Sequence, residues 1–173
     1  HLRAERILIE TIHRAQEQFI AADASQNIFD GLLQSLLDLT GSKYGFIDEM
    51  FHTADGKPYL SARAITDVSW NEQTRGMYAK FVSGELSFTK LESLFGAVMT
   101  TGKPVIANDA SNDPRRGGIP PGHPALKAFL GLPLHSNNRF VGVVGLANRP
   151  GGYSEEVITY LEPVVQACAN LLS

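Results

Sequence analysis

Apolar residues recur with the spacing of helices at both ends of this chain. Steps of four, three, four and three residues predict a first helix over about residues 2–23, with an apolar stripe formed by Leu8, Ile12, Ala15, Phe19 and Ala22. A second helix is predicted from Ser25, a suitable cap, to Gly41, which suits the position past a last turn. The final helix follows the Ser154 cap, and its stripe repeats the same steps through Val157, Leu161, Val164, Cys168 and Leu171.

The middle of the chain instead predicts strands joined by tight turns. The strands are expected at residues 44–51, 59–65, 104–107, 130–135 and 139–148. Asp55-Gly56 and Asn137-Asn138 supply the turn residues of two hairpins, so the sheet should be antiparallel. Terminal helices packed on one face of such a sheet make an α+β fold.

Two shorter amphipathic segments, around residues 70–82 and 91–101, interrupt this strand pattern. Residues 108–123 contain three prolines and three glycines without periodicity, which predicts a long loop. Residues 124–129 are expected to add a turn of helix before the next strand. Because no repeat or low-complexity tract divides the chain, residues 1–173 are predicted to form a single domain.

Composition narrows the range of partners. Hydrophobic residues make up 43% of the 173 residues and charged residues 19%, which is typical of a folded chain. Lys and Arg number 15 against 18 Asp and Glu, so the net charge is −3; without a basic run, we expect no nucleic-acid partner. The longest stretch without a polar side chain, Phe140–Ala147, is far shorter than the ~20 residues that span a bilayer, so we expect no direct membrane insertion.

Cysteine usage indicates the compartment. Cys168 is the single cysteine of the chain, which excludes an internal disulfide and any cysteine-rich metal site. Such usage fits a reducing, cytoplasmic location. Because the sequence begins at His1 rather than Met, we expect a domain excised from a larger, multidomain protein.

Motifs that would indicate an enzyme are missing from the sequence. Gly56-Lys57 and Gly102-Lys103 both continue into proline, so neither ends a phosphate-binding loop. The five histidines form no HExxH or HxH pair, and no GxSxG nucleophile elbow occurs. We therefore expect a non-enzymatic protein with no catalytic residues and no metal site.

A series of ordered motifs nevertheless points to one family. They are, in chain order, 44–47 (YGFI), 69–71 (SWN), 94–96 (LFG), 102–109 (GKPVIAND), 113–118 (DPRRGG), 122–124 (GHP), 129–133 (FLGLP) and 145–153 (GLANRPGGY). On these motifs the chain resembles a GAF domain over essentially its whole length. More narrowly, it resembles the bacterial subgroup attached to sensor histidine kinases of two-component systems, diguanylate cyclases and other signalling outputs.

This resemblance implies the arrangement of the fold in more detail. It implies a central six-stranded antiparallel sheet, with the first, second and last helices on one face. It also implies a ligand pocket on the opposite face, under the middle helices and the long loop. The ligand itself is not implied, because GAF domains bind cyclic nucleotides, tetrapyrroles, haem, small metabolites or nothing known.

Ten residues are candidate ligand contacts. They are Glu49, Trp70, Asn71, Arg75, Tyr78, Asn108, Asp109, Arg115, Arg116 and His123. An aromatic ring beside amide and guanidinium groups is typical of small-molecule pockets, although Trp70 and Tyr78 also fit core or roof packing. The two loop arginines fit either a lid over an anionic ligand or a surface loop paired to Asp109 and Asp113.

Glu49 stands in an otherwise apolar strand. A buried carboxylate needs a partner there, and Arg75 is a suitable one. In one orientation of the strand Glu49 reaches into the pocket as a hydrogen-bond acceptor. If the strand is turned the other way, Asp48 takes that role.

The cysteine count separates branches of the family. Bilin-binding GAF domains attach their chromophore through a pocket cysteine, and those that reduce free methionine sulfoxide use several. Here Cys168 lies on the apolar stripe of the last helix, where we expect it to be buried and inert. Neither covalent tetrapyrrole attachment nor reductase chemistry is therefore expected, and the cofactor stays unknown.

Two functions remain open at this point. The first is a regulatory sensor module that binds an unidentified small molecule and relays the signal through its terminal helices to an output domain of the same chain. The second is a structural dimerisation or spacer module without a ligand. Apolar residues beside the two helix stripes leave area to spare, namely Ile7, Ile9, Val165 and Leu172. We therefore expect a parallel homodimer through the terminal helices.

Overall fold

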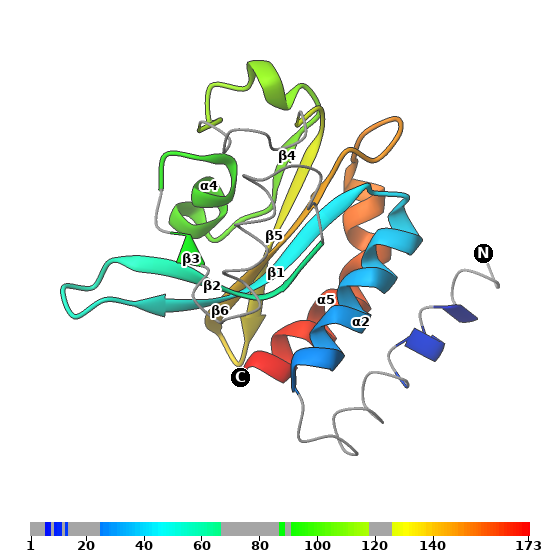
Figure 1. The fold of residues 1–173 in the computed structure, drawn as a ribbon, viewed down its shortest axis with the longest axis horizontal. Coiled ribbons are helices and arrows are strands. Elements are labelled where there is room, and N and C mark those ends of the chain that lie inside the picture. Colours follow the sequence, from blue (N-terminus) through cyan, green and yellow to red (C-terminus); the bar gives the residue numbers. More distant parts are fainter. Residues whose placement is uncertain are drawn as a thin grey trace, which may run out of the picture.

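In the computed structural model, an antiparallel sheet separates two long helices from a shorter one (Figure 1). The structure describes residues 6–7, 9–11, 13, 25–66, 87–88, 91–117 and 126–173. Its elements in chain order are α2 (Ser25–Thr40), β1 (Tyr44–His52), β2 (Pro58–Ile65), β3 (Ser87–Phe88), α4 (Leu94–Thr101), β4 (Val105–Ala107), the 3₁₀ turn η1 (Ala110–Asn112), β5 (Phe129–Ser136), β6 (Arg139–Ala147) and α5 (Glu155–Leu172). This arrangement confirms the α+β class.

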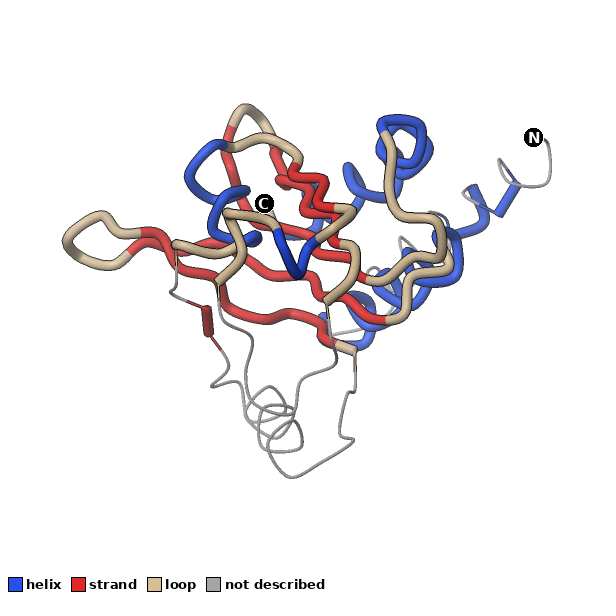
Figure 2. Tube along the Cα trace, turned by 90° about the horizontal axis from the view of Figure 1, so that it is seen from above, coloured by secondary structure: helices blue, strands red, loops and turns tan. Residues whose placement is uncertain are grey.

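The described strands form one sheet in the order β3-β2-β1-β6-β5-β4, and each neighbouring pair is antiparallel. β1 and β6 lie at its centre. The turn between β1 and β2 projects away from the rest of the sheet in both views (Figure 2). The sequence did not predict β3, because two residues are too few to show a periodic pattern.

The turns and helix ends follow the predicted residues. Asn137 and Asn138 have φ angles of 52° and 65°, as the two central positions of a type I′ hairpin require. Gly41 has a φ of 70° and donates its backbone N–H to the Leu37 carbonyl at 2.8 Å, which ends α2. Ser154 caps α5 by accepting a hydrogen bond from the backbone N–H of Val157.

α2 and α5 cover one face of the sheet and share a continuous apolar core with it (Figure 1). The most buried members include Ile28, Leu32, Leu36, Ile47, Val144, Leu146, Leu161, Val164 and Cys168. Each fully buried aliphatic side chain contributes roughly 1.5–3 kcal/mol to folding. Cys168 has no exposed surface, and burial raises the pKa of its thiol to about 12, so its predicted burial is confirmed.

α4 lies on the other face, against β4, β5 and β6. The Ser93 hydroxyl caps it by accepting from the Gly96 backbone N–H at 3.0 Å. Its Val98 packs with Phe129 and Val143 of the sheet in a second apolar cluster. This face is the one on which the family resemblance implies a pocket.

One local prediction is wrong. Residues 126–128 run without helical structure into β5, instead of adding the expected turn of helix at 124–129. Asn148 explains this conformation, because its side-chain oxygen accepts from the backbone N–H groups of Lys127 at 2.7 Å and Ala128 at 3.2 Å. Those donors are therefore held by the end of β6 rather than by a helix.

The predicted first helix lies mostly outside the described residues. Residues 6–7, 9–11 and 13 are helical, but all five members of its predicted apolar stripe fall outside the description. Ile7 and Ile9 are exposed by 41% and 56% of their surface. In contrast, Val165 and Leu172 of α5 are partly buried against the core of the helix-covered face.

Candidate functional site

Alternation along β1 decides which side chains face α4. Phe46 and Met50 pack with the α4 cluster, whereas Ile47 lies in the core under α2 and α5. Asp48 shares the face of Phe46 and Met50, and it stands opposite Val143 of β6, another member of the α4 cluster. The carboxyl that faces α4 is therefore that of Asp48, the alternative that the sequence left open.

Asp48 is an isolated acid in an apolar setting. Its side chain is completely buried, and neither carboxyl oxygen has a hydrogen-bond partner among the described residues. Burial raises the pKa of Asp48 well above its usual range, because a charged carboxylate loses its hydration there without gaining a partner. The neutral acid form therefore persists to higher pH than it would in water.

Glu49 faces the helix-covered side instead. It pairs in register with Gly142 of β6, where an added side chain would approach Leu172 of α5 to 3.0 Å. Its carboxylate binds Arg63 of β2, whose Nε donates to Oε1 at 2.8 Å. Among the described residues its partner is thus Arg63, and Arg75, the partner suggested by the sequence, lies outside them. The hairpin pattern placed both residues on neighbouring strands, but a β-bulge set their register.

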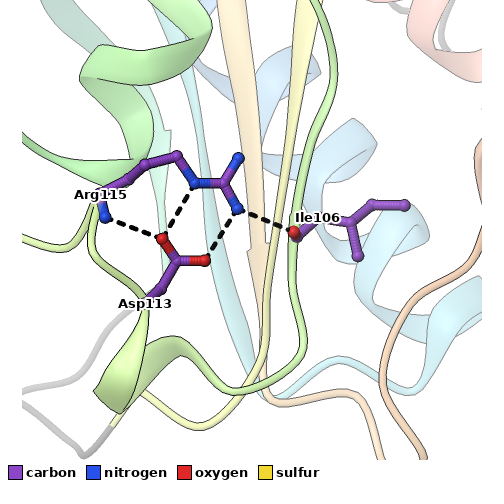
Figure 3. Close-up of polar contacts among 3 residues, drawn as sticks. All are labelled: Ile106, Asp113 and Arg115. Carbon is purple, nitrogen blue, oxygen red and sulfur yellow. Dashed lines mark hydrogen bonds and ion pairs between the residues drawn. The ribbon is translucent and has the colours of Figure 1, made fainter.

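Arg115 is held by its own loop (Figure 3). Its Nε and Nη2 donate to the two carboxylate oxygens of Asp113 at 2.9 and 2.8 Å, and Nη2 also donates to the Ile106 carbonyl at 3.1 Å. This pairing lowers the pKa of Asp113 and raises that of Arg115. The loop therefore has the predicted arginine–aspartate pair of a well-connected surface loop, and contact of Arg115 with a ligand stays a prediction.

Asn108 fixes the end of β4 to the start of α5. Its amide oxygen accepts from the Tyr153 backbone N–H at 2.8 Å, and its amide nitrogen donates to the Tyr153 carbonyl at 2.9 Å. Gly152 permits this approach, since its φ is 80° and a side chain there would lie 2.6 Å from the Asn108 amide oxygen. This structural role was missed in the sequence, because its partner lies 45 residues away.

The other candidates divide into two groups. Asp109 accepts a hydrogen bond from the Asn112 side chain at 3.2 Å. The side chain of Arg116 is exposed, and the backbone N–H of Arg116 donates to the Asp113 carbonyl. The remaining candidates lie outside the described residues: Trp70, Asn71, Arg75, Tyr78 and His123.

Buried hydroxyl groups at the end of the sheet are all engaged, unlike Asp48. The Tyr153 hydroxyl is 2.7 Å from the Ser42 hydroxyl, which is in turn 2.7 Å from that of Thr40. The Asn148 amide donates to the Tyr44 hydroxyl at 3.3 Å. Burial raises the pKa of Tyr44 to about 12 and also raises the pKa of Tyr153, so both phenol groups stay neutral at ordinary pH.

Neither a metal-binding cluster nor a membrane-spanning helix occurs in the described ranges. No group of three or more His, Cys, Asp or Glu side chains there could hold a metal ion. Among the helices described, none combines the length and apolar character needed to cross a membrane.

Comparison with protein families gives a match over most of the chain. The family model described as GAF domain matches residues 22–173. No curated protein matches the chain.

Solved structures share the fold at low sequence identity. The GAF domain of a phosphoenolpyruvate-protein phosphotransferase from Coxiella burnetii is 16% identical with a TM-score of 0.72, covering 94% of this chain and 90% of that one. Free methionine-R-sulfoxide reductase from Neisseria meningitidis, in complex with its substrate, is 10% identical with a TM-score of 0.69 and coverages of 98% and 87%. Residues 122 to 287 of a methyl-accepting chemotaxis protein are 12% identical with a TM-score of 0.64, and each chain is covered to 93%.

The Asn108 contacts predict a loss of stability. Asn108→Ala removes both hydrogen bonds to Tyr153 and should lower the free energy of unfolding by roughly 1–3 kcal/mol, measured by urea denaturation. The matched control is Asn112→Ala, which loses only exposed contacts with Asp109 and should change stability by less than about 0.5 kcal/mol. Equal effects of the two substitutions would contradict the structural role of Asn108.

Asp48 predicts an unusual dependence of stability on pH. The pKa of Asp48 in the folded protein lies above its unfolded value of 3.8. The contribution of protonated Asp48 to stability is therefore complete below pH 3.8 and is lost as the pH rises through the folded-state pKa. Asp48→Asn keeps the shape and cannot ionise. The free energy of unfolding of Asp48→Asn should therefore match that of the wild type near pH 4 and exceed it by roughly 1–3 kcal/mol above the folded-state pKa.

The measurement is urea unfolding followed across this pH range. Asp38→Asn is the matched control, because Asp38 is an exposed carboxylate on α2. Stability curves of the wild type and Asp48→Asn that run parallel at every pH would show that Asp48 is not buried as an unpaired acid.

Proposed function

Because this chain belongs to the GAF domain family, whose members are generally regulatory sensor modules in signalling proteins, we propose that it is a non-catalytic sensor of a small organic molecule. The ligand binds on the α4 face of the sheet, and the terminal helices on the opposite face relay its presence to an output domain of the same chain. The observation that carries this proposal is the buried, unpartnered Asp48 on that face. A buried polar group without a partner destabilises the fold, and such groups are found preferentially at functional sites.

The strand β1 offers a direct mechanical route between the two faces. Asp48 faces α4, and its neighbour Ile47 is completely buried in the core beneath α2 and α5. A ligand that moves Asp48 therefore moves a residue in contact with the helix layer. In a close-packed interior such small shifts are passed on rather than absorbed, which favours two alternative packings of the helices.

The ligand contacts that we propose extend beyond Asp48. Arg116 and Asp109 lie on the loop after β4 and are exposed to an incoming molecule. From the family resemblance we add Trp70, Asn71, Arg75, Tyr78 and His123. Glu49 and Asn108 are less suited to contact a ligand, because Glu49 forms an ion pair with Arg63 and Asn108 forms hydrogen bonds with Tyr153.

Reductase activity is not part of this proposal. The structurally similar Neisseria meningitidis protein is a free methionine-R-sulfoxide reductase. This chain has one cysteine, and its thiol on α5 is fully buried in the core with a raised pKa. A thiol held in this way is a poor nucleophile.

The wider context is proposed from the same family resemblance. We propose a cytoplasmic location, which suits the single free cysteine. Sensor histidine kinases of two-component systems and diguanylate cyclases are the proposed classes of output domain. A ligand-free dimerisation or spacer module is the alternative function, and the exposed Ile7 and Ile9 are the observation that favours it.

Native mass spectrometry of the protein purified from its own host tests the sensor function. We expect a small-molecule adduct of constant mass that disappears on denaturation, because a buried site releases its ligand only when it opens. A protein that carries no adduct, and that gains none from a low-molecular-weight extract of the host, would instead support the spacer function.

The terminal helices predict a two-fold homodimer. Changing the exposed Ile7 and Ile9 together to Glu should convert a dimer to a monomer in sedimentation velocity at micromolar concentration, because it places charge in an apolar contact. The matched control is Arg6→Glu, which adds negative charge at an exposed position of the same segment and should leave the dimer intact. A monomeric wild type would contradict the homodimer.

A further inference from the structure

Asp48 has two free acceptor positions in a place where the fold needs none. Both Oδ1 and Oδ2 are buried without a hydrogen-bond partner among the described residues. The neighbouring side chains on its face are apolar, since Met50, Leu60 and Val143 all belong to the α4 cluster. An apolar side chain at this position would make the protein more stable, so folding alone does not explain the carboxyl group.

No described charge faces Asp48 to neutralise it. α4 carries no titratable side chain, and Glu49 and Arg63 bind each other on the opposite face of the sheet. Tyr44 shares the face of Asp48, but it lies four residues along β1 and pairs with Asn148. The other titratable side chains on β1, β2, β5 and β6 are His52, Tyr59, His135 and Arg139, of which Tyr59 stacks on Phe51 and the rest are exposed.

We propose that Asp48 is the recognition group for a small ligand that carries a planar amidine-type cation, such as an amidinium or guanidinium, on an apolar body. This inference rests on the proposed sensor function and names the class of its ligand. Two parallel N–H donors match two free carboxylate oxygens, which a single ammonium does not. A delocalised cation is also more weakly hydrated than an ammonium, so it enters an apolar site at lower cost.

The apolar body follows from the surroundings of the carboxyl. Phe46 and Met50 flank Asp48 along β1, and Leu60 and Val143 lie on the strands to either side. Leu60 and Val143 are fully buried, so a group that reaches Asp48 meets carbon atoms there rather than further polar groups. Binding specificity is then set by one charged pair inside an apolar setting.

Below the folded-state pKa of Asp48, binding of such a cation releases a proton. In that pH range the free protein holds Asp48 as a neutral acid and the bound state is a carboxylate paired with the cation, so one proton leaves to solvent. Below the folded-state pKa of Asp48 the affinity should therefore rise about tenfold per pH unit, and above it the affinity should level off. Burial, which raises that pKa, sets the pH at which this change occurs.

Isothermal titration calorimetry with benzamidine as the probe tests the inference. Measurements in two buffers with different ionisation enthalpies should show release of one proton per benzamidine bound at low pH. Asp48→Asn should bind benzamidine at least about tenfold more weakly and release no proton, as expected when a charge-assisted pair is lost. Asp38→Asn, which changes an exposed carboxylate on α2, should behave as the wild type.

Several results would overturn the inference. They are absence of benzamidine binding at millimolar concentration, equal binding by Asp48→Asn, and equally tight binding of neutral benzamide. A loss with Glu49→Gln but not with Asp48→Asn would assign recognition to the neighbouring carboxylate instead.

The host-purified protein separates this inference from the sensor function. A co-purified ligand that stays bound to Asp48→Asn would leave the sensor function intact and defeat the role of Asp48. If the wild type carries no such ligand but binds benzamidine through Asp48, the recognition chemistry holds and the sensor function fails.

Discussion

The pairing of β1 with β6 is the contact on which the rest of this structure depends. The two strands run antiparallel from Tyr44 opposite Ala147 to Glu49 opposite Gly142, at the centre of the sheet. Because side chains alternate along a strand, this register decides which residues meet the helix layer and which meet α4. A shift by one residue would place Asp48 in the main core and expose Ile47 to the opposite face.

The two faces of the sheet differ in chemistry as a consequence. The helix-covered face is a continuous apolar core, and the half-buried Glu49 on that side is neutralised by Arg63. The α4 face is also apolar, but it contains one carboxyl without a partner in the described structure. By contrast, the buried hydroxyl groups of Tyr153, Ser42 and Thr40 are hydrogen-bonded to one another. The unpaired acid is therefore the main chemical difference between the two faces.

Loops at the end of the sheet give this arrangement a rigid frame. Asn108 ties the end of β4 to the residues before α5, while Asn148 ties the end of β6 to the segment before β5. Arg115 pairs with Asp113 inside its own loop and also reaches the Ile106 carbonyl of β4. Such connections limit movement of the loop relative to the sheet.

The sequence alone determined the elements whose signals are local. Apolar periodicity, Ser154, Gly41 and the Asn137-Asn138 turn defined α2, α5 and both hairpins, because caps and turns depend on neighbouring residues. It could not decide between Asp48 and Glu49, since alternation fixes which residues share a face but not which layer that face meets. Nor could it find Arg63 for Glu49 or Tyr153 for Asn108, because a bulge and a long-range contact made those pairs. Only the tertiary structure decided these points, since burial and partnership are set by residues distant in the chain.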